Sequence, residues 1–273
     1  MDTTPHLDPL QDDTWKAQGL WHGFFNRFGG VSHSPYESLN TGLLTDDAAS
    51  NVATNRGRVA SWLGVTPEHL LGAEQVHGAR VLTVRGALAT ESWRETVAKE
   101  KADALVSDDP AFVLSVVTAD CVPVLLATEG GAVVGAAHAG WRGAVGGVLE
   151  NTVAAMVDLG AVPATVQAVV GPAIGPASYE TGADMRSAVL DGTPGVAQQA
   201  AAHLFTPAVR SGHFMFNLPA YVALRLRLAG VDAVRVMAVD TVRDGRFFSY
   251  RRTHLTGGGP TGRQLSAIRA RPA

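Results

Sequence analysis

Runs of apolar residues separated by glycine-rich turns dominate the middle of the chain. Residues 112–117 and 122–127 are almost wholly apolar and rich in β-branched side chains, which favours two buried strands. A third apolar run, 132–143, follows a turn at Glu129-Gly130-Gly131 and ends in a glycine-rich corner. The pattern predicts a group of buried strands that are consecutive in the chain.

Other segments repeat apolar residues with the spacing of an amphipathic helix. This pattern predicts helices over 51–65, 146–160 and 217–231, and a shorter one over 183–191. Gly160 ends the second of these, while Asn217 and Pro219 are suited to the N-cap and first turn of the third.

The remaining segments complete a mixed pattern. We expect a strand at 70–84 that is interrupted by His77-Gly78, and a strand followed by a loop over 166–176. A final strand is expected at 234–242, before the basic tail 246–263. Residues 87–101 are charged and should form a surface excursion, while 194–214 fit no single element. Short strands that alternate irregularly with helices indicate an α+β or mixed α/β fold. We expect a loose leader at 1–18 and a single domain over 19–273.

Charge and composition narrow the class of protein. The 273 residues carry a net charge of -3 without a block of Lys or Arg, which argues against a nucleic-acid partner. No apolar run reaches the ~20 residues of a membrane helix, and the polar N-terminus lacks the features of a secretory signal. A single cysteine cannot form an intramolecular disulfide. These features predict a cytoplasmic protein.

That single cysteine, Cys121, lies within an apolar stretch, "TADCVPVLL". His138 lies near the end of the 132–143 strand and His77 at the interruption of the 70–84 strand, each beside small residues that let side chains converge. One thiolate and two imidazoles suit zinc, and three protein ligands leave a fourth position open, as in catalytic zinc sites.

Other interpretations of the same residues stay open. A free cysteine in a buried strand is usually a small hydrophobic residue, although the neighbouring Asp120 needs a partner or a purpose there. Cys121 and a histidine could instead form a nucleophilic pair. His138 could also be a hydrogen-bonded histidine of the core.

Seven segments together make the chain, from about residue 23 to 263, similar to a known family. The chain resembles the YfiH-type purine nucleoside phosphorylases, formerly called polyphenol oxidases or laccase-domain proteins. The matching segments are "NRFGGVSHSPYESLNTG", "EQVHGARV", "ADALVSDDP", "TADCVPVLL", "AAHAGWRG", "GPAIGPASYETG" and, around a longer insert, "FFSYRR" with "TGR". Many relatives also carry a cysteine near residues 239–244, which this chain lacks.

The resemblance implies a fold, a cofactor and an activity. The fold would be a single domain of two packed mixed β-sheets with helices outside. One catalytic zinc ion would be bound by His77, Cys121 and His138. The substrates would be purine nucleosides (adenosine, inosine, guanosine and methylthioadenosine) and phosphate, with the base and sugar 1-phosphate as products. Some members of the family also deaminate adenosine.

Phosphorolysis requires groups that bind phosphate, and arginine side chains or helix N-termini supply them. Arg142 lies close to His138 and directly before the predicted helix 146–160, so it is the first candidate. Arg27 in the "NRFGG" loop is the second candidate, and Arg251 is a third.

Other polar residues near the predicted site could share the remaining work. Asp120 could orient a metal ligand or accept a proton. Asn40 and Gln75 could hydrogen-bond the sugar or the base, and Tyr179 could stack on a purine.

Two further functions fit the sequence less well. A copper-dependent polyphenol oxidase would need a dense set of histidines, yet no two histidines are two positions apart and Cys121 has none within ten. A non-catalytic protein with a structural zinc would normally supply four ligands, and only three are found.

Overall fold

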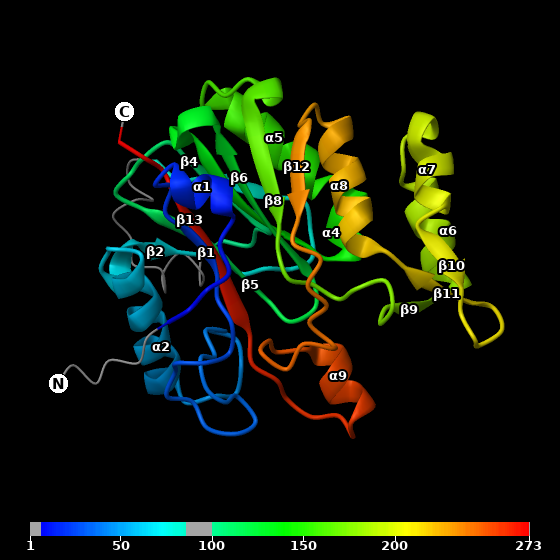
Figure 1. The fold of residues 1–273 in the computed structure, drawn as a ribbon, viewed down its shortest axis with the longest axis horizontal. Helices are drawn as coiled ribbons and strands as arrows, with labels where there is room; N and C mark the ends of the chain where they lie inside the picture. Colours follow the sequence, from blue (N-terminus) through cyan, green and yellow to red (C-terminus); the bar gives the residue numbers. More distant parts are fainter. Residues whose placement is uncertain (1–6, 86–99, 273) are drawn as a thin grey trace.

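The structure, a computed structural model, describes residues 7–85 and 100–272 (Figure 1). Its central element is a mixed sheet of six strands in the order β12-β8-β6-β7-β4-β3. These strands are Ala233–Val236, Val166–Val170, Val122–Thr128, Val134–Ala139, Ala104–Ser107 and Val81–Thr83. β6 and β7 form an antiparallel hairpin through the 3-10 turn Glu129–Gly131, where Gly130 has a φ of 82°. The predicted consecutive strands are confirmed.

A second sheet packs face to face against the first. Its order is β1-β13-β5-β2, with bounds His22–Phe24, Gln264–Arg269, Val113–Thr118 and Leu70–Leu71. Leu114 and Val116 of β5 belong to the same apolar cluster as Leu125 of β6 and Ala136 of β7. The expectation of two packed mixed sheets is therefore confirmed.

Helices cover the outer faces of these two sheets (Figure 1). α5 (Val148–Asp158) and α8 (Leu218–Leu228) pack against the six-stranded sheet, and α2 (Ala49–Trp62) packs against the other. The side chain of Asn217 accepts a hydrogen bond from the amide of Ala220 at 3.1 Å, as expected for the N-cap of α8. The predicted helices are confirmed within a few residues at each end.

A third, antiparallel sheet was not expected from the sequence. It has the order β10-β11-β9, with bounds Phe205–Pro207, His213–Phe216 and Glu180–Gly182. It lies with α6 (Ala183–Asp191) and α7 (Gln198–Ala202) at one side of the molecule (Figure 1). Most of the segment 194–214, which fitted no single element, is used here.

Three local predictions need correction. The glycine-rich corner after β7 is a helix, α4 (Trp141–Gly146), separated from α5 by Gly147 with a φ of 94°. The strand β12 is shorter than 234–242 and is not the last, because β13 follows it. The basic tail contains a helix, α9 (Tyr250–Leu255).

The described part of the leader is packed rather than loose. Residues 13–17 form α1 (Asp13–Ala17), and Trp15 is only 1% exposed. Residues 1–6, and residues 87–99 of the expected surface excursion, lie outside the described residues. Across the described ranges, none of the helices combines the length and apolar character needed to span a membrane.

Candidate metal centre

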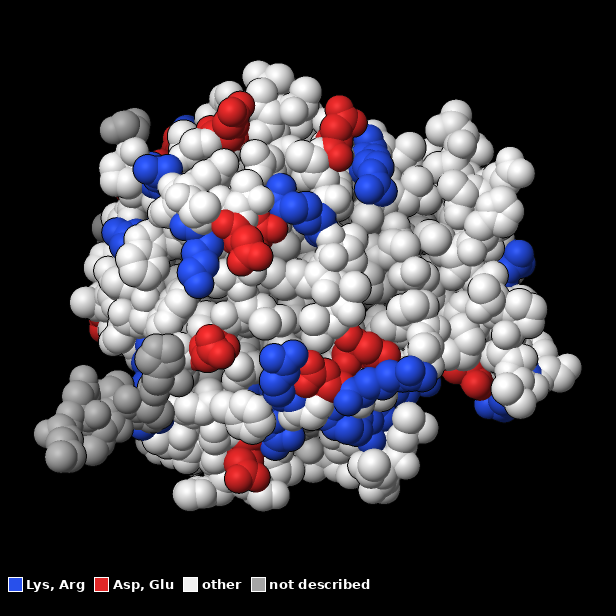
Figure 2. Space-filling model, viewed as in Figure 1, with Lys and Arg blue, Asp and Glu red and all other residues white. Residues whose placement is uncertain are grey.

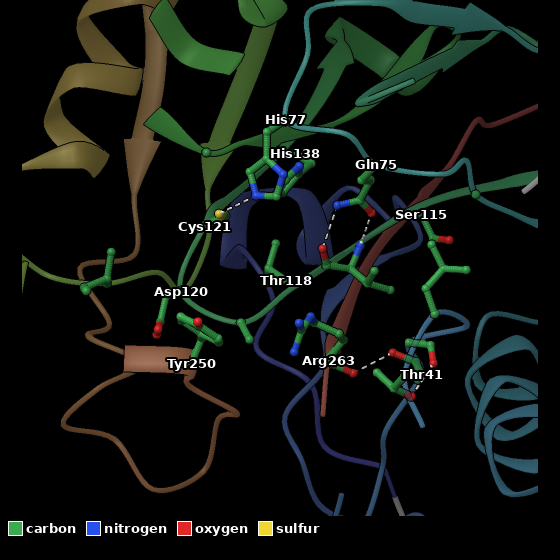
Figure 3. A pocket seen from close by; sticks show the side chains of 18 of the residues that line it. Thr41, Gln75, His77, Ser115, Thr118, Asp120, Cys121, His138, Tyr250 and Arg263 are labelled. Carbon is green, nitrogen blue, oxygen red and sulfur yellow. Dashed lines mark hydrogen bonds between the residues drawn. The ribbon is translucent and has the colours of Figure 1, made fainter. Parts of the chain in front are cut away.

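Three side chains meet where the chain passes from one sheet to the other. Cys121 lies between β5 and β6, His138 lies in β7 opposite Pro123 of β6, and His77 lies on the loop between β2 and β3. Their ligand atoms all lie within 4.8 Å of one another, and Sγ of Cys121 is 3.8 Å from Nε2 of His77 (Figure 3). The structure thus brings together the three residues predicted as zinc ligands.

A buried carboxylate, Asp103, fixes both histidines. One of its oxygens contacts Nδ1 of His138 at 2.8 Å and accepts the backbone N–H of His77 at 2.9 Å. The other accepts the backbone N–H groups of Gly78 at 2.7 Å and Val76 at 3.1 Å. With Nδ1 of His138 committed to the carboxylate, Nε2 is left to face a metal, which is the usual carboxylate–histidine arrangement of metal sites.

The electrostatics of the cluster favour a thiolate. Burial raises the pKa of Cys121, but attraction to His138 and hydrogen bonds from both histidines outweigh it and lower the pKa to about 6. Burial lowers the pKa of His138, but attraction to Cys121 and the hydrogen bond to Asp103 raise it to about 9. The thiolate is the form of cysteine that binds metals, so the lowered pKa favours Cys121 as a ligand, while His138 must release a proton before its Nε2 can bind a metal.

Gly140 leaves the space in which these ligands meet. It is the N-cap residue of α4, with a φ of -66° that any residue can adopt. A Cβ atom at this position would lie 2.9 Å from Cδ2 of His77 and 3.1 Å from Sγ of Cys121. The absence of a side chain at this position is therefore a steric requirement of the cluster.

A cavity of about 550 Å³ opens beside the three ligands (Figure 3). The lining includes four arginines, Arg56, Arg142, Arg251 and Arg263, and one carboxylate, Asp120. Aromatic side chains line it as well, namely Trp141, Tyr179 and Tyr250. The excess of positive charge suits an anionic ligand, and the rings offer flat surfaces for a planar one.

Three predicted substrate-binding residues line this cavity. The guanidinium of Arg142 lies 4.6 Å from the ring centroid of Trp141. Arg251 donates from Nη2 to the carbonyl of Glu180 at 3.1 Å, and its guanidinium lies 5.5 Å from the ring centroid of Tyr179. Burial is the largest of the effects that raise the pKa of Tyr179 to about 12, so this phenol stays neutral.

The side chains of Gln75 and Asp120 also line the cavity, but each is already hydrogen-bonded. The amide of Gln75 donates to the carbonyl of Val117 and accepts from its N–H, both at 2.8 Å. The carboxylate of Asp120 accepts from the hydroxyl of Thr241 at 2.7 Å and from the backbone N–H of Arg251 at 2.6 Å.

Two predicted residues do not line the cavity. Asn40 is fully buried, and its amide donates to Thr45 and Asp47 at 2.9 Å. The guanidinium of Arg27 lies 4.9 Å from the ring centroid of Phe248. Both residues serve the loop structure around the cavity.

Sequence reasoning assigned no role to Asp103 or Arg263. Asp103 stands directly before a buried strand, which is a weak signal for a buried carboxylate. Arg263 lies in the matched segment "TGR", and its Nη1 donates to the carbonyls of Thr261 at 2.9 Å and Gly262 at 3.0 Å. The path of the loops determines that Arg263 faces the cavity, and this path cannot be predicted from the sequence pattern.

The sequence profile of the multi-copper polyphenol oxidoreductase laccase family matches residues 21–271. The chain belongs to this family. Two curated relatives align with the chain over most of its length. The chain is 39% identical over 249 residues to "Purine nucleoside phosphorylase ORF3" of Streptomyces griseus, covering 91% of this chain and 96% of that one. It is 38% identical over 239 residues to "Purine nucleoside phosphorylase YfiH" of Escherichia coli, covering 85% and 88%.

Solved structures share the fold of this chain. The hypothetical protein YfiH of Bacillus licheniformis superposes with a TM-score of 0.85 at 29% identity, over 99% of this chain and 98% of that one. YlmD of Geobacillus stearothermophilus superposes with a TM-score of 0.78 at 31% identity, over 92% of each chain. The family and the fold expected from the seven sequence segments are confirmed.

Proposed function

We propose that the protein is a zinc-dependent purine nucleoside phosphorylase. The observation that carries this proposal is the pairing of a His77-Cys121-His138 cluster with an arginine-lined cavity. The names of the relatives from Streptomyces griseus and Escherichia coli support the same activity. The proposed substrates are phosphate and adenosine, inosine, guanosine or methylthioadenosine, including deoxyribose forms.

The donor set fits zinc. One thiolate and two imidazoles are the ligands that zinc prefers, and three protein ligands leave a position for substrate. The carboxylate of Asp103 on Nδ1 of His138 supplies the outer hydrogen bond that metal-bound histidines usually make. When bound there, zinc would act as a Lewis acid that polarises an oxygen of the substrate.

Copper-dependent oxidation of phenols is the alternative that the family description suggests. Coupled copper centres need many histidines, and the chain has 9, none two positions apart. Within residues 7–85 and 100–272, His77, Cys121 and His138 form the one group suited to a metal. The residues therefore favour a single zinc over a multi-copper centre.

The chain's own side chains would divide the remaining work. Arg142, Arg251 and Arg263 would hold the phosphate by charge-assisted hydrogen bonds. The purine would lie against Trp141 or Tyr179. A phosphate oxygen then bonds to the anomeric carbon while the bond from that carbon to the purine nitrogen breaks, and the purine takes the electron pair and a proton. The products are the free base and the sugar 1-phosphate.

The products formed from adenosine test this proposal. Purified protein loaded with zinc is incubated with adenosine, with and without phosphate, and the products are separated by chromatography. We expect adenine and ribose 1-phosphate only when phosphate is present. Adenine released without phosphate would indicate a hydrolase, inosine would indicate an adenosine deaminase, and no product would contradict the proposed activity.

A further inference from the structure

We infer that Asp120 is a positioning residue: its carboxylate holds helix α9 in place so that Arg251 faces the cavity. The inference rests on the proposed function for what Arg251 binds, but the anchoring itself stands on geometry. This role differs from the two that the sequence predicted for Asp120, which were to orient a metal ligand or to accept a proton.

The carboxylate of Asp120 is directed away from the metal ligands. The residue is 8% exposed and has a φ of 90°, in the left-handed region that side chains rarely adopt. Figure 3 shows the carboxylate pointing toward α9 and away from His77. Among the described residues, its hydrogen bonds go to Thr241 and to the backbone of Arg251, one from each oxygen. The side chains of the adjacent residues Asp120 and Cys121 therefore point in different directions, Cys121 toward the histidines and Asp120 toward α9.

These two contacts fasten both ends of the segment 241–251. The hydroxyl of Thr241 binds one carboxylate oxygen at its start, and the N–H of Arg251 binds the other in the first turn of α9. The hydroxyl of Ser249 accepts the next first-turn N–H, that of Arg252, at 3.0 Å. First-turn N–H groups have no partner within a helix, so a carboxylate and a hydroxyl supplied there stabilise the turn.

Polar contacts matter at α9 because the helix has little apolar anchoring. None of its six residues is buried, and Tyr250 and Leu255 are 59% and 69% exposed. The guanidinium of Arg252 folds the segment on itself, donating to the carbonyls of Thr241 at 2.7 Å and of Phe247. Acidic and basic side chains gather over this part of the surface (Figure 2). A helix with this environment depends on hydrogen bonds for its position.

The position of α9 determines one wall of the cavity. Tyr250 and Arg251 line the cavity from α9, and Arg251 also reaches the carbonyl of Glu180 and the ring of Tyr179. Asp120 directly precedes the predicted metal ligand Cys121 in the chain. Of these two adjacent residues, Cys121 belongs to the metal cluster and Asp120 holds the helix that carries Arg251. Loss of the anchor should therefore weaken the binding of phosphate without removing the metal.

The test replaces Asp120 with alanine, which removes both hydrogen bonds. We expect the amides of residues 250–255 to exchange hydrogen faster than in the wild-type protein, while the bound zinc stays at the wild-type level. The KM for phosphate should rise about tenfold or more, since hydrogen bonds to charged groups are among the stronger ones. The kcat should change much less, because the reacting groups remain in place.

Three further variants make the test specific. Thr241→Val removes one of the two hydrogen bonds to Asp120. It should raise the KM for phosphate and the rate of amide exchange at α9, but by less than Asp120→Ala does. In an Arg251→Ala background, Asp120→Ala should raise the KM for phosphate little further. A residue that acts on phosphate binding through the side chain of Arg251 has no further effect on KM once that side chain is gone. Asp184→Asn alters an exposed carboxylate in the first turn of α6 and should leave amide exchange, bound zinc, KM and kcat unchanged.

Two results would overturn the inference. A fall in kcat with unchanged exchange at α9 would place Asp120 in the chemistry, and a loss of bound zinc would place it in support of the metal. Absence of phosphorolysis in the wild-type protein would contradict the proposed function alone, because hydrogen exchange at α9 still reports on the anchor.

Discussion

Replacing His138 with alanine is expected to reduce phosphorolysis by at least about 10³-fold. The change removes one of three metal ligands, and Lewis-acid stabilisation of a transition state is worth several kcal/mol, with tenfold in rate for each ~1.4 kcal/mol. The fold should persist, because Asp103 still accepts three backbone N–H groups from the loop that carries His77. The measurements are kcat with adenosine and phosphate, bound zinc, and the melting temperature.

The matched control is His203→Ala, which changes an exposed histidine at the C-terminus of α7. It should keep full activity and the wild-type content of zinc. Undiminished turnover in the His138 variant would show that the cluster is not the reactive centre.

Replacing Gly140 with alanine is expected to weaken zinc binding about 10- to 100-fold. The new Cβ would lie 2.9 Å from the ring of His77 and 3.1 Å from the sulfur of Cys121, so at least one ligand must move. Overpacking of this kind typically costs about 1–3 kcal/mol, and ~1.4 kcal/mol corresponds to a factor of ten in affinity. The affinity is measured by competition with a zinc chelator of known strength.

Gly146→Ala is the control, because Gly146 is the last residue of the same short helix. A Cβ there would meet only the side chain of Ala79, at an ordinary 3.8 Å. Zinc affinity should not change, and a glycine-to-alanine change within a helix can stabilise the protein by about 0.5–1 kcal/mol. Equal zinc affinity in the two variants would contradict the steric account of Gly140.

The sequence predicted the elements whose patterns are long or strongly signalled. β6, α5 and α8 have continuous apolar runs, helical periodicity or a clear N-cap, and each lies where it was expected. β13 was missed because its six residues, 264–269, follow a glycine-rich segment and pair with β5, about 150 positions earlier in the chain. Local patterns do not encode pairings over such separations.

In the candidate site, too, the sequence predicts some residues and misses others whose roles depend on distant parts of the chain. Cys121, His77 and His138 could be proposed from residue types, since a thiol and imidazoles beside small residues in strand-like segments are unusual. The role of Asp103 depends on the backbone N–H groups of a loop that lies more than 20 positions away. Arg27 and Arg263 both lie near glycines in loops, and only the folded path of those loops turns Arg263 toward the cavity.

Metal reconstitution tests the central claim most directly. The protein is stripped with a chelator, and phosphate-dependent release of adenine from adenosine is measured before and after addition of one equivalent of Zn²⁺ or of Cu²⁺. We predict no turnover without metal and restoration by Zn²⁺. Full phosphorolysis by the metal-free protein, or oxidation of a phenol restored by Cu²⁺ alone, would contradict the account.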